Sequence, residues 1–320
     1  MCWKMANKKN TGNMPKASVV LMVDTEGEFS RLAFSSRTPL LYKIKMAISY
    51  WAGMDYSLKT LDKIVKILKK YNLPATFFFV GALYLRKQDK SPLKKYIETK
   101  SKTSYLFNIK KIIRIIPSWG DYIEKNMKND LFELGIHNFL HESNFVEDDE
   151  QIRKSIKYTK KAANAIGIKP KSYAAPWFEL ETKESPKRIY DILKTENIDS
   201  TRFDGILDTR LNKIIKKNKI SQIYKRYGIN CINSSYFIAN GKIDKKEYAV
   251  IEKGIQKAIN NGAVYAISTH DTTFAREGTK HFENIIRTIS KYRKDIQIRK
   301  ISDLVKNGKP TTHKRSCTGL

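Results

Sequence analysis

The chain has 320 residues, of which 41% are hydrophobic and 11% aromatic, and this apolar content excludes a wholly disordered protein. Its Lys and Arg residues exceed its Asp and Glu residues by 29 charges, spread along the whole chain. Such a charge attracts anionic partners, but lysines on the solvated faces of a compositionally biased protein would give the same excess, so both interpretations stay open.

Cysteine spacing and hydropathy indicate the cellular compartment to expect. Cys2, Cys231 and Cys317 are odd in number and far apart, which argues against a disulfide framework and against a thiolate zinc site. No secretory signal is visible in the first eighteen residues, and no run approaches the roughly 18 apolar residues of a membrane span. We therefore expect a cytoplasmic protein, with peripheral contact to the inner face of the membrane as an open alternative.

The first predicted elements follow a polar segment of residues 1–16, which is expected to be disordered. Residues 18–24 are almost continuously apolar and end in an acid, as in a short buried strand. Residues 28–57 are predicted to form a long loop, and loops of this length usually carry function. Apolar residues at helical spacing from Leu61 then predict an amphipathic helix, followed by a strand over residues 75–80.

An alternation of strands and helices continues to residue 292. Further strands are expected at residues 131–138, 172–175 and 264–269, and further helices at residues 151–166, 186–196, 248–261 and 281–292. This alternation favours a parallel sheet covered by helices, either open or closed into a barrel. The candidate acids and histidines all lie at the C-terminal ends of predicted strands. In parallel barrels these ends form the catalytic face.

Residues 82–128 separate two core strands by more than a helix requires. Within them, Ile109, Ile112, Ile113 and Ile116 have helical spacing, with basic residues between them and Trp119 beyond. This pattern predicts a basic amphipathic helix within residues 105–119. It either lies in a membrane interface or packs on the core of the domain, and we favour the core.

Two histidines and two acids form the candidate metal site. His137 and His141 are four residues apart, so one helical turn after the strand would direct both imidazoles at one metal ion. Asp24 and Glu26 add carboxylates at the end of the first strand, and two histidines with one carboxylate are common in hydrolytic metal sites. The two acids could instead cap a helix or belong to a turn.

Further candidates follow two later strands. His270 ends an apolar strand, from where it could donate a proton to a leaving amine. Asp271 either orients His270 or simply begins the next loop. Pro176 and Trp177 follow the strand of residues 172–175 and could form a substrate platform, although both are also ordinary loop residues.

Together these segments resemble the polysaccharide deacetylase family, the NodB-homology domain of carbohydrate esterase family four. The resemblance extends from about residue 18 to residue 304, and its order and spacing are specific although no single motif is. It rests on Val-Asp-Thr-Glu-Gly at 23–27, Ala-Thr-Phe-Phe-Phe-Val-Gly at 75–81, Gly-Ile-His-Asn-Phe-Leu-His at 135–141, Ser-Tyr-Ala-Ala-Pro-Trp at 172–177 and Ala-Ile-Ser-Thr-His-Asp at 266–271. The first motif resembles the family's variant in which one residue separates the two acids.

The resemblance implies an α/β fold, a distorted (β/α) barrel of about seven parallel strands. The catalytic domain would span residues 17–306, with the insertion at 82–128, and a tail of residues 307–320 would follow. The implied reaction is hydrolysis of an acetyl or other small acyl group from an N-acylated amino-sugar in a glycan or glycolipid. The partners would be a carbohydrate or lipid-linked sugar and a divalent metal, with zinc as the first candidate.

The resemblance also implies roles for the candidate residues. Asp24 would be the general base and His270 the general acid, and a backbone N–H near Trp177 would help to stabilise the oxyanion. The implied metal ligands are Glu26, His137 and His141. The implied substrate contacts are Pro176, Trp177 and Asp271.

One departure from the family concerns the general base. The third motif of the family usually begins with an Arg that orients the catalytic aspartate, and here that position is Ala174. Arg202, near the end of a later strand, is a candidate replacement. Loss of the Arg also motivates an alternative, a catalytically silent homologue that binds metal and glycan. A nucleic-acid-binding protein ranks last, because no recognised nucleic-acid module is present.

Overall fold

The computed structural model describes residues 16–27, 56–99, 116–181, 185–203, 220–221, 223–238, 243 and 245–307. Most of the expected loop at 28–57 and of the expected helix within 105–119 lies outside these residues. Nearly all of the N-terminal segment and of the tail also lies outside them, so the predicted domain limits stay predictions.

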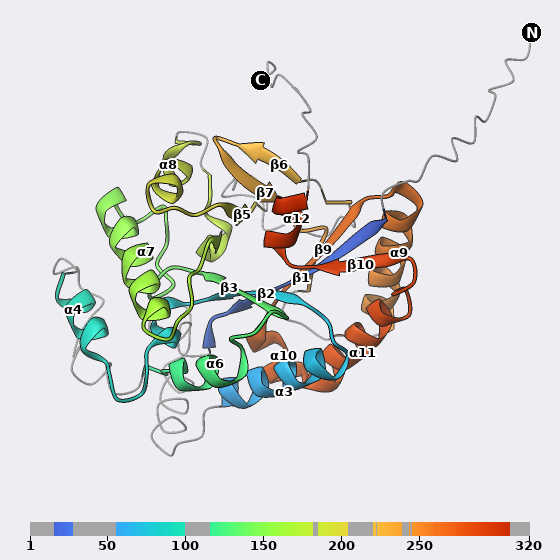
Figure 1. Cartoon of the computed structure of the whole chain (residues 1–320), viewed down its shortest axis with the longest axis horizontal. Helices are drawn as coiled ribbons and strands as arrows, with labels where there is room; N and C mark the ends of the chain where they lie inside the picture. Colours follow the sequence, from blue (N-terminus) through green and yellow to red (C-terminus); the bar gives the residue numbers. More distant parts are fainter. Residues whose placement is uncertain are drawn as a thin grey trace, which may run out of the picture.

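The described strands form one sheet of ten strands (Figure 1). The order is β6-β7-β5-β4-β3-β2-β1-β9-β8, and β10 pairs with β1. All of these pairs are parallel except β6 with β7. The strands are β1 (Ala17–Thr25), β2 (Ala75–Phe79), β3 (Phe132–Ile136), β4 (Ser172–Ala174), β5 (Ser200–Arg202), β6 (Ile223–Arg226), β7 (Ile229–Ile232), β8 (Tyr236–Ile238), β9 (Val264–His270) and β10 (Ile296–Arg299).

The sheet curls until its two ends meet, as in a distorted barrel. Ser221, just before β6, donates its backbone N–H to the carbonyl of Val264 at 2.8 Å, and its hydroxyl hydrogen-bonds that of Ser235 before β8. These contacts join the β6 edge to the β8–β9 edge. The predicted α/β fold with a barrel of parallel strands is therefore confirmed, with the antiparallel β6 as an addition.

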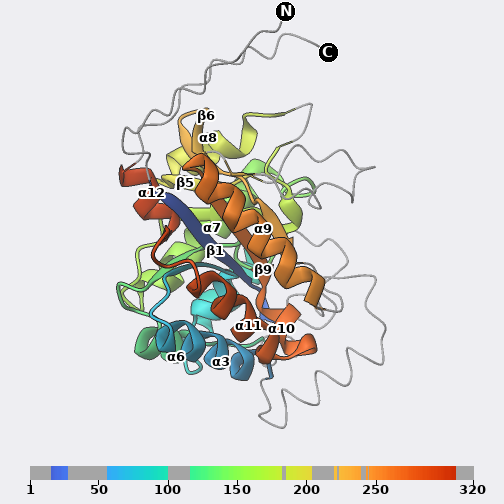
Figure 2. The ribbon, with the colours of Figure 1, turned by 90° about the vertical axis from the view of Figure 1, so that its right-hand side faces the viewer.

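All of the described helices except α12 cover the outside of the curled sheet, and α9 packs across β1 and β9 (Figure 2). None of the described helices is both long and apolar enough to cross a membrane. The helices are α3 (Tyr56–Lys70), α4 (Ser91–Thr99), α6 (Gly120–Asn126), α7 (Asp149–Asn164), α8 (Arg188–Thr195), α9 (Lys245–Asn261), α10 (Asp271–Glu277), α11 (Thr279–Ser290) and α12 (Ile301–Asn307), with short 3₁₀ turns η1 (Gly81–Tyr84) and η2 (Pro176–Phe178).

The longer elements occur where the sequence predicts them, with limits that differ by a few residues. The sequence did not predict α4, α6, β6, β7, β8, β10, α10 or α12 as separate elements. These elements have three to nine residues, too few for a hydrophobic period to be distinguished from chance.

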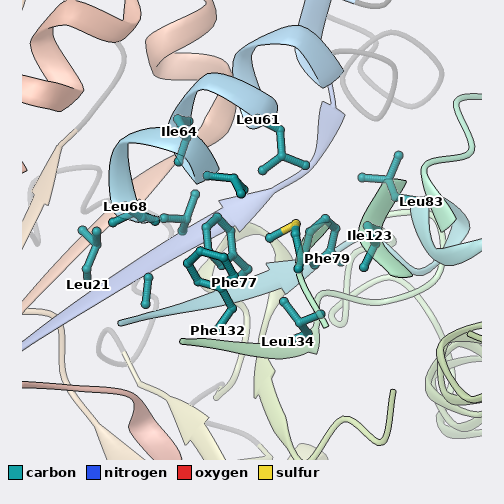
Figure 3. Packing of buried hydrophobic residues seen from close by; sticks show 14 of the residues in the cluster. Leu21, Leu61, Ile64, Leu68, Phe77, Phe79, Leu83, Ile123, Phe132 and Leu134 are labelled. Atoms are coloured by element: carbon teal, nitrogen blue, oxygen red, sulfur yellow. The ribbon is translucent and has the colours of Figure 1, made fainter. Parts of the chain in front are cut away.

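The outer core lies where α3 packs on the sheet (Figure 3). Leu61, Ile64 and Leu68 share one buried cluster with Leu21 of β1 and Phe77 of β2. The helical spacing of the three α3 residues places them on one face, and this face covers the strands. The predicted amphipathic helix is therefore explained by burial of its apolar face.

The first strand is continuously apolar because both of its faces are buried. Leu21 belongs to the outer cluster, whereas Val20 and Met22 belong to a cluster inside the curl with Ile301 and Leu304 of α12. This is the pattern of a strand in a sheet that is covered on both sides. Helix α12 thereby fills part of the interior of the barrel.

The position of Trp119 contradicts part of the hypothesis that residues 105–119 contact a membrane. Its side chain is buried, and its ring lies so close to Gly27 that a Cβ there would be 3.2 Å from Trp119 Cη2. Ile116 is also buried. Trp119 thus packs in the core and offers no ring to a lipid headgroup. Tyr105 and Phe107 lie outside the described residues, so contact through 105–119 stays a prediction.

Replacing Phe77 with Ala tests the outer core. The ring is fully buried and meets Phe132 edge-on at 5.5 Å between centroids. Phe77→Ala should lower the free energy of unfolding by about 3–5 kcal/mol, because it leaves a cavity between α3 and the sheet. Denaturant titration measures this, with the exposed Lys63→Ala as the control. Equal stability of the two variants would contradict the assignment of the core.

Candidate active site

Three strands bring the predicted site residues to one edge of the sheet. Asp24 lies in β1, two residues before Glu26, and pairs in register with His270 at the end of β9. His137 directly follows β3, which is separated from β1 by β2. Because the parallel strands end at the same edge, residues far apart in the sequence converge there.

His137 and His141 meet through a loop, which corrects the expected helical turn. Asn138 and His141 have left-handed φ angles of 54° and 61°, and these bend the chain so that the two imidazole centroids lie 4.8 Å apart. Left-handed backbone is unfavourable for residues other than glycine, so this loop requires support from its surroundings.

Glu142 supplies much of this support. Its buried carboxylate accepts hydrogen bonds from the backbone N–H of Leu140 at 2.8 Å and from the hydroxyl of Ser155 in α7 at 3.1 Å. It also accepts one from the hydroxyl of Tyr96 in α4. The side-chain amide of Asn138 donates to the Glu142 carbonyl at 2.9 Å. The loop is thus tied to two helices outside the sheet.

Glu26, His137 and His141 form a group whose possible ligand atoms all lie within 4.8 Å of one another. Glu26 Oε1 lies 3.3 Å from His141 Nε2 and 3.7 Å from His137 Nε2. All three side chains are buried. Two imidazoles and a carboxylate are a donor set that divalent transition metals bind.

The histidine nitrogens fit a metal site. His137 Nδ1 donates to the Ala174 carbonyl at 2.8 Å, because a carbonyl oxygen can only accept, and this leaves Nε2 as the nitrogen that faces Glu26. Within the described part of the chain, His137 Nε2 and both nitrogens of His141 are buried without a hydrogen-bond partner. Buried unpartnered acceptors are unfavourable, and a metal ion would satisfy His137 Nε2 and the acceptor nitrogen of His141.

Asp24 is held by Arg202. The guanidinium donates from Nη1 to Oδ1 at 2.6 Å and from Nη2 to Oδ2 at 2.8 Å, and both side chains are 1% exposed. Burial alone would raise the pKa of Asp24, but the charge of Arg202 and the nearby His137 and His270 hold it below its ordinary value. Asp24 is therefore an ionised carboxylate in a fixed orientation.

Arg202 takes the place of the arginine that the family usually has at the position of Ala174. Ala174 of β4 pairs in register with Arg202 of β5, so the guanidinium reaches Asp24 from the adjacent strand. The rings of Phe78 and Phe178 lie 5.7 Å and 5.4 Å from its Cζ, within range of cation–π contact. The proposed spatial replacement of the missing arginine is thus present in the structure.

His270 lies beside both acids. Its Nε2 is 3.1 Å from Glu26 Oε1 and 3.6 Å from Asp24 Oδ2, and the ring is 12% exposed. Phe237 of β8 meets this ring edge-on at 5.0 Å between centroids. His270 is thus partly accessible and next to the candidate base. The sequence analysis identified neither Phe237 nor Glu142, because neither belongs to a chemical motif.

The carboxylate of Asp271 is turned toward backbone N–H groups, and its predicted contact with substrate stays a prediction. Its buried carboxylate accepts the backbone N–H groups of Glu26 at 3.2 Å, Gly27 at 3.3 Å and Thr272 at 2.8 Å. Burial, together with the charge of Glu26, raises the pKa of Asp271 to about 7. Asp271 positions the backbone that carries Glu26, and its carboxylate makes no hydrogen bond to His270 among the described contacts.

Trp177 borders the site on a strained turn. It has a φ of 58° and Phe178 a φ of 62°, both in the left-handed region. Pro176 is buried at the start of this turn, whereas the Trp177 side chain is 46% exposed and meets His141 edge-on at 4.9 Å. Of the three residues predicted to contact substrate, Trp177 is thus the one with an accessible side chain.

Comparison with known proteins supports the resemblance found in the sequence. Residues 52–183 match the family model described as polysaccharide deacetylase. A comparison with curated proteins found no match. The resemblance to the polysaccharide deacetylase family is therefore confirmed.

Solved structures share the fold. A "putative polysaccharide deacetylase" from Mycobacterium smegmatis aligns with 92% of this chain and 90% of its own, at 14% identity and a TM-score of 0.56. The Puue allantoinase aligns over the same shares at 10% identity and a TM-score of 0.55. A 4-alpha-glucanotransferase from Thermococcus litoralis aligns with 93% of this chain and 41% of its own, at 13% identity and a TM-score of 0.51. Because these proteins are named for different activities, the fold alone does not decide the reaction.

Replacing Glu142 with Ala tests the support of the histidine loop. The change leaves the Leu140 N–H and two hydroxyls without their buried acceptor, so Glu142→Ala should lower the free energy of unfolding by at least about 3 kcal/mol. Denaturant titration measures this, with Glu150→Ala, an exposed acid of α7, as the control. A change no larger than that of the control would contradict the role of Glu142.

Proposed function

We propose that this protein, whose resemblance to the polysaccharide deacetylase family is confirmed, removes an acetyl or other small acyl group from an N-acylated amino-sugar in a glycan or glycolipid. The observation that carries the proposal is the donor group of Glu26, His137 and His141 directly beside Asp24 and His270. Hydrolysis of an amide needs a site that polarises the carbonyl, a base for water and an acid for nitrogen.

Glu26, His137 and His141 would hold a divalent metal ion. When bound there, the ion would act as a Lewis acid toward the acyl carbonyl and lower the pKa of water. Zinc is the first candidate, because it accepts imidazole and carboxylate ligands, although cobalt, nickel and iron accept the same set. Burial alone would raise the pKa of Glu26, but His270 and His141 hold it well below its ordinary value, so the carboxylate is ionised as a ligand must be.

Asp24 is the proposed base. It is ionised, and the paired bonds from Arg202 fix its plane while leaving oxygen lone pairs free to accept a proton from the attacking water. His270 is the proposed acid, since its accessible ring lies beside Asp24 and can protonate the nitrogen. Protonation matters because an amine leaves an acyl group far more readily than an amide anion does.

The turn at Trp177 would bind the sugar. Its exposed indole gives a flat, partly apolar surface against which a pyranose ring can lie, and its neighbour His141 belongs to the proposed metal site. The backbone N–H near Trp177 is the proposed donor to the oxyanion, as the family resemblance implies.

The alternative of a silent homologue rested on Ala174. Arg202 now supplies the guanidinium that was missing from the motif, so this reason for silence no longer holds. The contact of Arg202 with Asp24 therefore supports an active enzyme over a protein that only binds glycan.

Acetate release tests the proposed activity. The purified full chain should release acetate from a panel of N-acetylated sugars when a divalent metal is added, and bind the metal. Glu26→Ala and His137→Ala should each lower turnover at least about a hundredfold and reduce the bound metal. His281→Ala serves as the control, because His281 contacts Tyr248 between α11 and α9. Turnover of the two site variants at the level of the control would contradict the proposal.

A relocated arginine tests the pairing of Arg202 with Asp24. Arg202→Ala should lower kcat at least about tenfold, since Asp24 loses its fixed plane. Adding Ala174→Arg should restore part of the rate, because residue 174 lies beside residue 202 in the sheet.

The matched control for this pair is Arg226→Ala, which breaks the bidentate contact of Arg226 with Glu181. It should reduce stability and leave kcat close to that of the wild type. If Arg226→Ala lowered kcat as much as Arg202→Ala, and Ala174→Arg restored nothing, Arg202 would have only a structural role.

A further inference from the structure

A second candidate site lies at the opposite end of the sheet from the active site. A cavity of about 440 Å³ is lined by residues at the N-terminal ends of β3, β4 and β5 and by α12. Phe132 begins β3 and His137 follows its end, so at 3.3 Å per residue these two positions are about 16 Å apart. The cavity is therefore separate from the candidate active site.

Positive charge dominates the cavity. Its acids already have partners: Asp199 Oδ2 lies 3.3 Å from Lys171 Nζ, and Glu133 Oε2 accepts from the Thr76 hydroxyl and the Ser302 N–H. Its lysines are Lys128, Lys169, Lys171, Lys300 and Lys306. Of these, Lys128, Lys169 and Lys306 form no ion pair with a carboxylate of the described residues. The cavity thus carries a surplus of positive charge that its own acids do not neutralise.

The Lys128 ammonium lies close to a glycine. Gly167, in the turn between α7 and β4, has a φ of +73°, and a Cβ there would lie 2.3 Å from Lys128 Nζ. A side chain at this position would both strain the backbone and displace the ammonium group. Lys300 is held as well, because its ammonium donates to the Asp130 carbonyl at 2.5 Å. Lys300 is thus placed by a backbone contact, and the Lys128 ammonium lies close to Gly167.

The cavity also has an apolar part. Phe132 and Leu134 of β3, Ile168 before β4 and Val305 of α12 line it together with the lysines. Its volume is within the range of small-molecule sites in proteins. Cations around an apolar surface suit a ligand that carries a concentrated negative charge on an apolar body.

We propose that this cavity binds a phosphate ester, with the phosphate among Lys128, Lys169 and Lys306 and the apolar portion against Phe132 and Ile168. Phosphate is favoured because it can carry two negative charges in a small volume, and several ammonium groups can share them. Such an ester could be a soluble nucleotide or a phospholipid headgroup, which share this chemistry. The site is independent of the deacetylase proposal.

Binding to the full chain tests the proposal, with ADP, inorganic pyrophosphate and phosphatidylcholine vesicles containing phosphatidic acid as probes. Calorimetry measures the soluble probes and co-sedimentation the vesicles. Lys128→Glu with Lys169→Glu should weaken binding at least about tenfold. Lys63→Glu with Lys257→Glu, on exposed positions of α3 and α9, changes net charge equally and should weaken binding less than about twofold.

The outcomes separate the two sources and can overturn the proposal. ADP binding that exceeds pyrophosphate binding supports a soluble ester on the apolar surface, and vesicle binding alone supports a lipid headgroup. Binding of no probe, or equal loss in both double variants, overturns the site and leaves only general electrostatic attraction. Acetate release should be unchanged in both double variants. If the Lys128→Glu, Lys169→Glu variant misfolds, Lys128→Gln with Lys169→Gln replaces it.

Discussion

Two ionised carboxylates, Asp24 and Glu26, are buried side by side, and the rest of the candidate active site depends on how they are compensated. Burial of an unpaired charge is so unfavourable that a carboxyl group would protonate instead. Arg202 compensates Asp24 through two short hydrogen bonds, and imidazoles surround Glu26. Removing one partner from such a buried pair usually costs about 3–5 kcal/mol, so the absence of Arg at position 174 requires a guanidinium from elsewhere.

Strained backbone concentrates at this site. Asn138, His141, Trp177 and Phe178 all have left-handed φ angles, and such residues cost about 1–3 kcal/mol each unless the surroundings support them. The surroundings do so here through the hydrogen bonds of Glu142 and through aromatic contacts, including Phe178 against Phe237 at 5.2 Å between centroids. The same contacts that hold the strain also direct His141 toward Glu26.

The parallel sheet separates two chemical environments. Its carboxyl edge gathers acids and histidines, whereas the cavity at its other edge gathers lysines. Each β–α connection contributes to one edge and each α–β connection to the other, so the two surfaces can differ without affecting each other. Five of the lysines that contribute to the large positive charge of the chain therefore lie together at one end of the barrel. Other lysines lie on exposed helix faces.

The alternation of strands and helices could be predicted from the sequence alone, because apolar periodicity reports directly which faces are buried, as in α3 and β1. The sequence also predicted that Glu26, His137, His141, Asp24 and His270 lie together, since the strand ends of one parallel sheet lie at one edge. The folded structure was needed to show that a loop, and not a helical turn, joins the two histidines, that Asp271 bonds to backbone, and that Trp119 is buried. It also decided that Arg202 reaches Asp24, because that contact joins residues 178 positions apart through strand order and register, which no local pattern encodes.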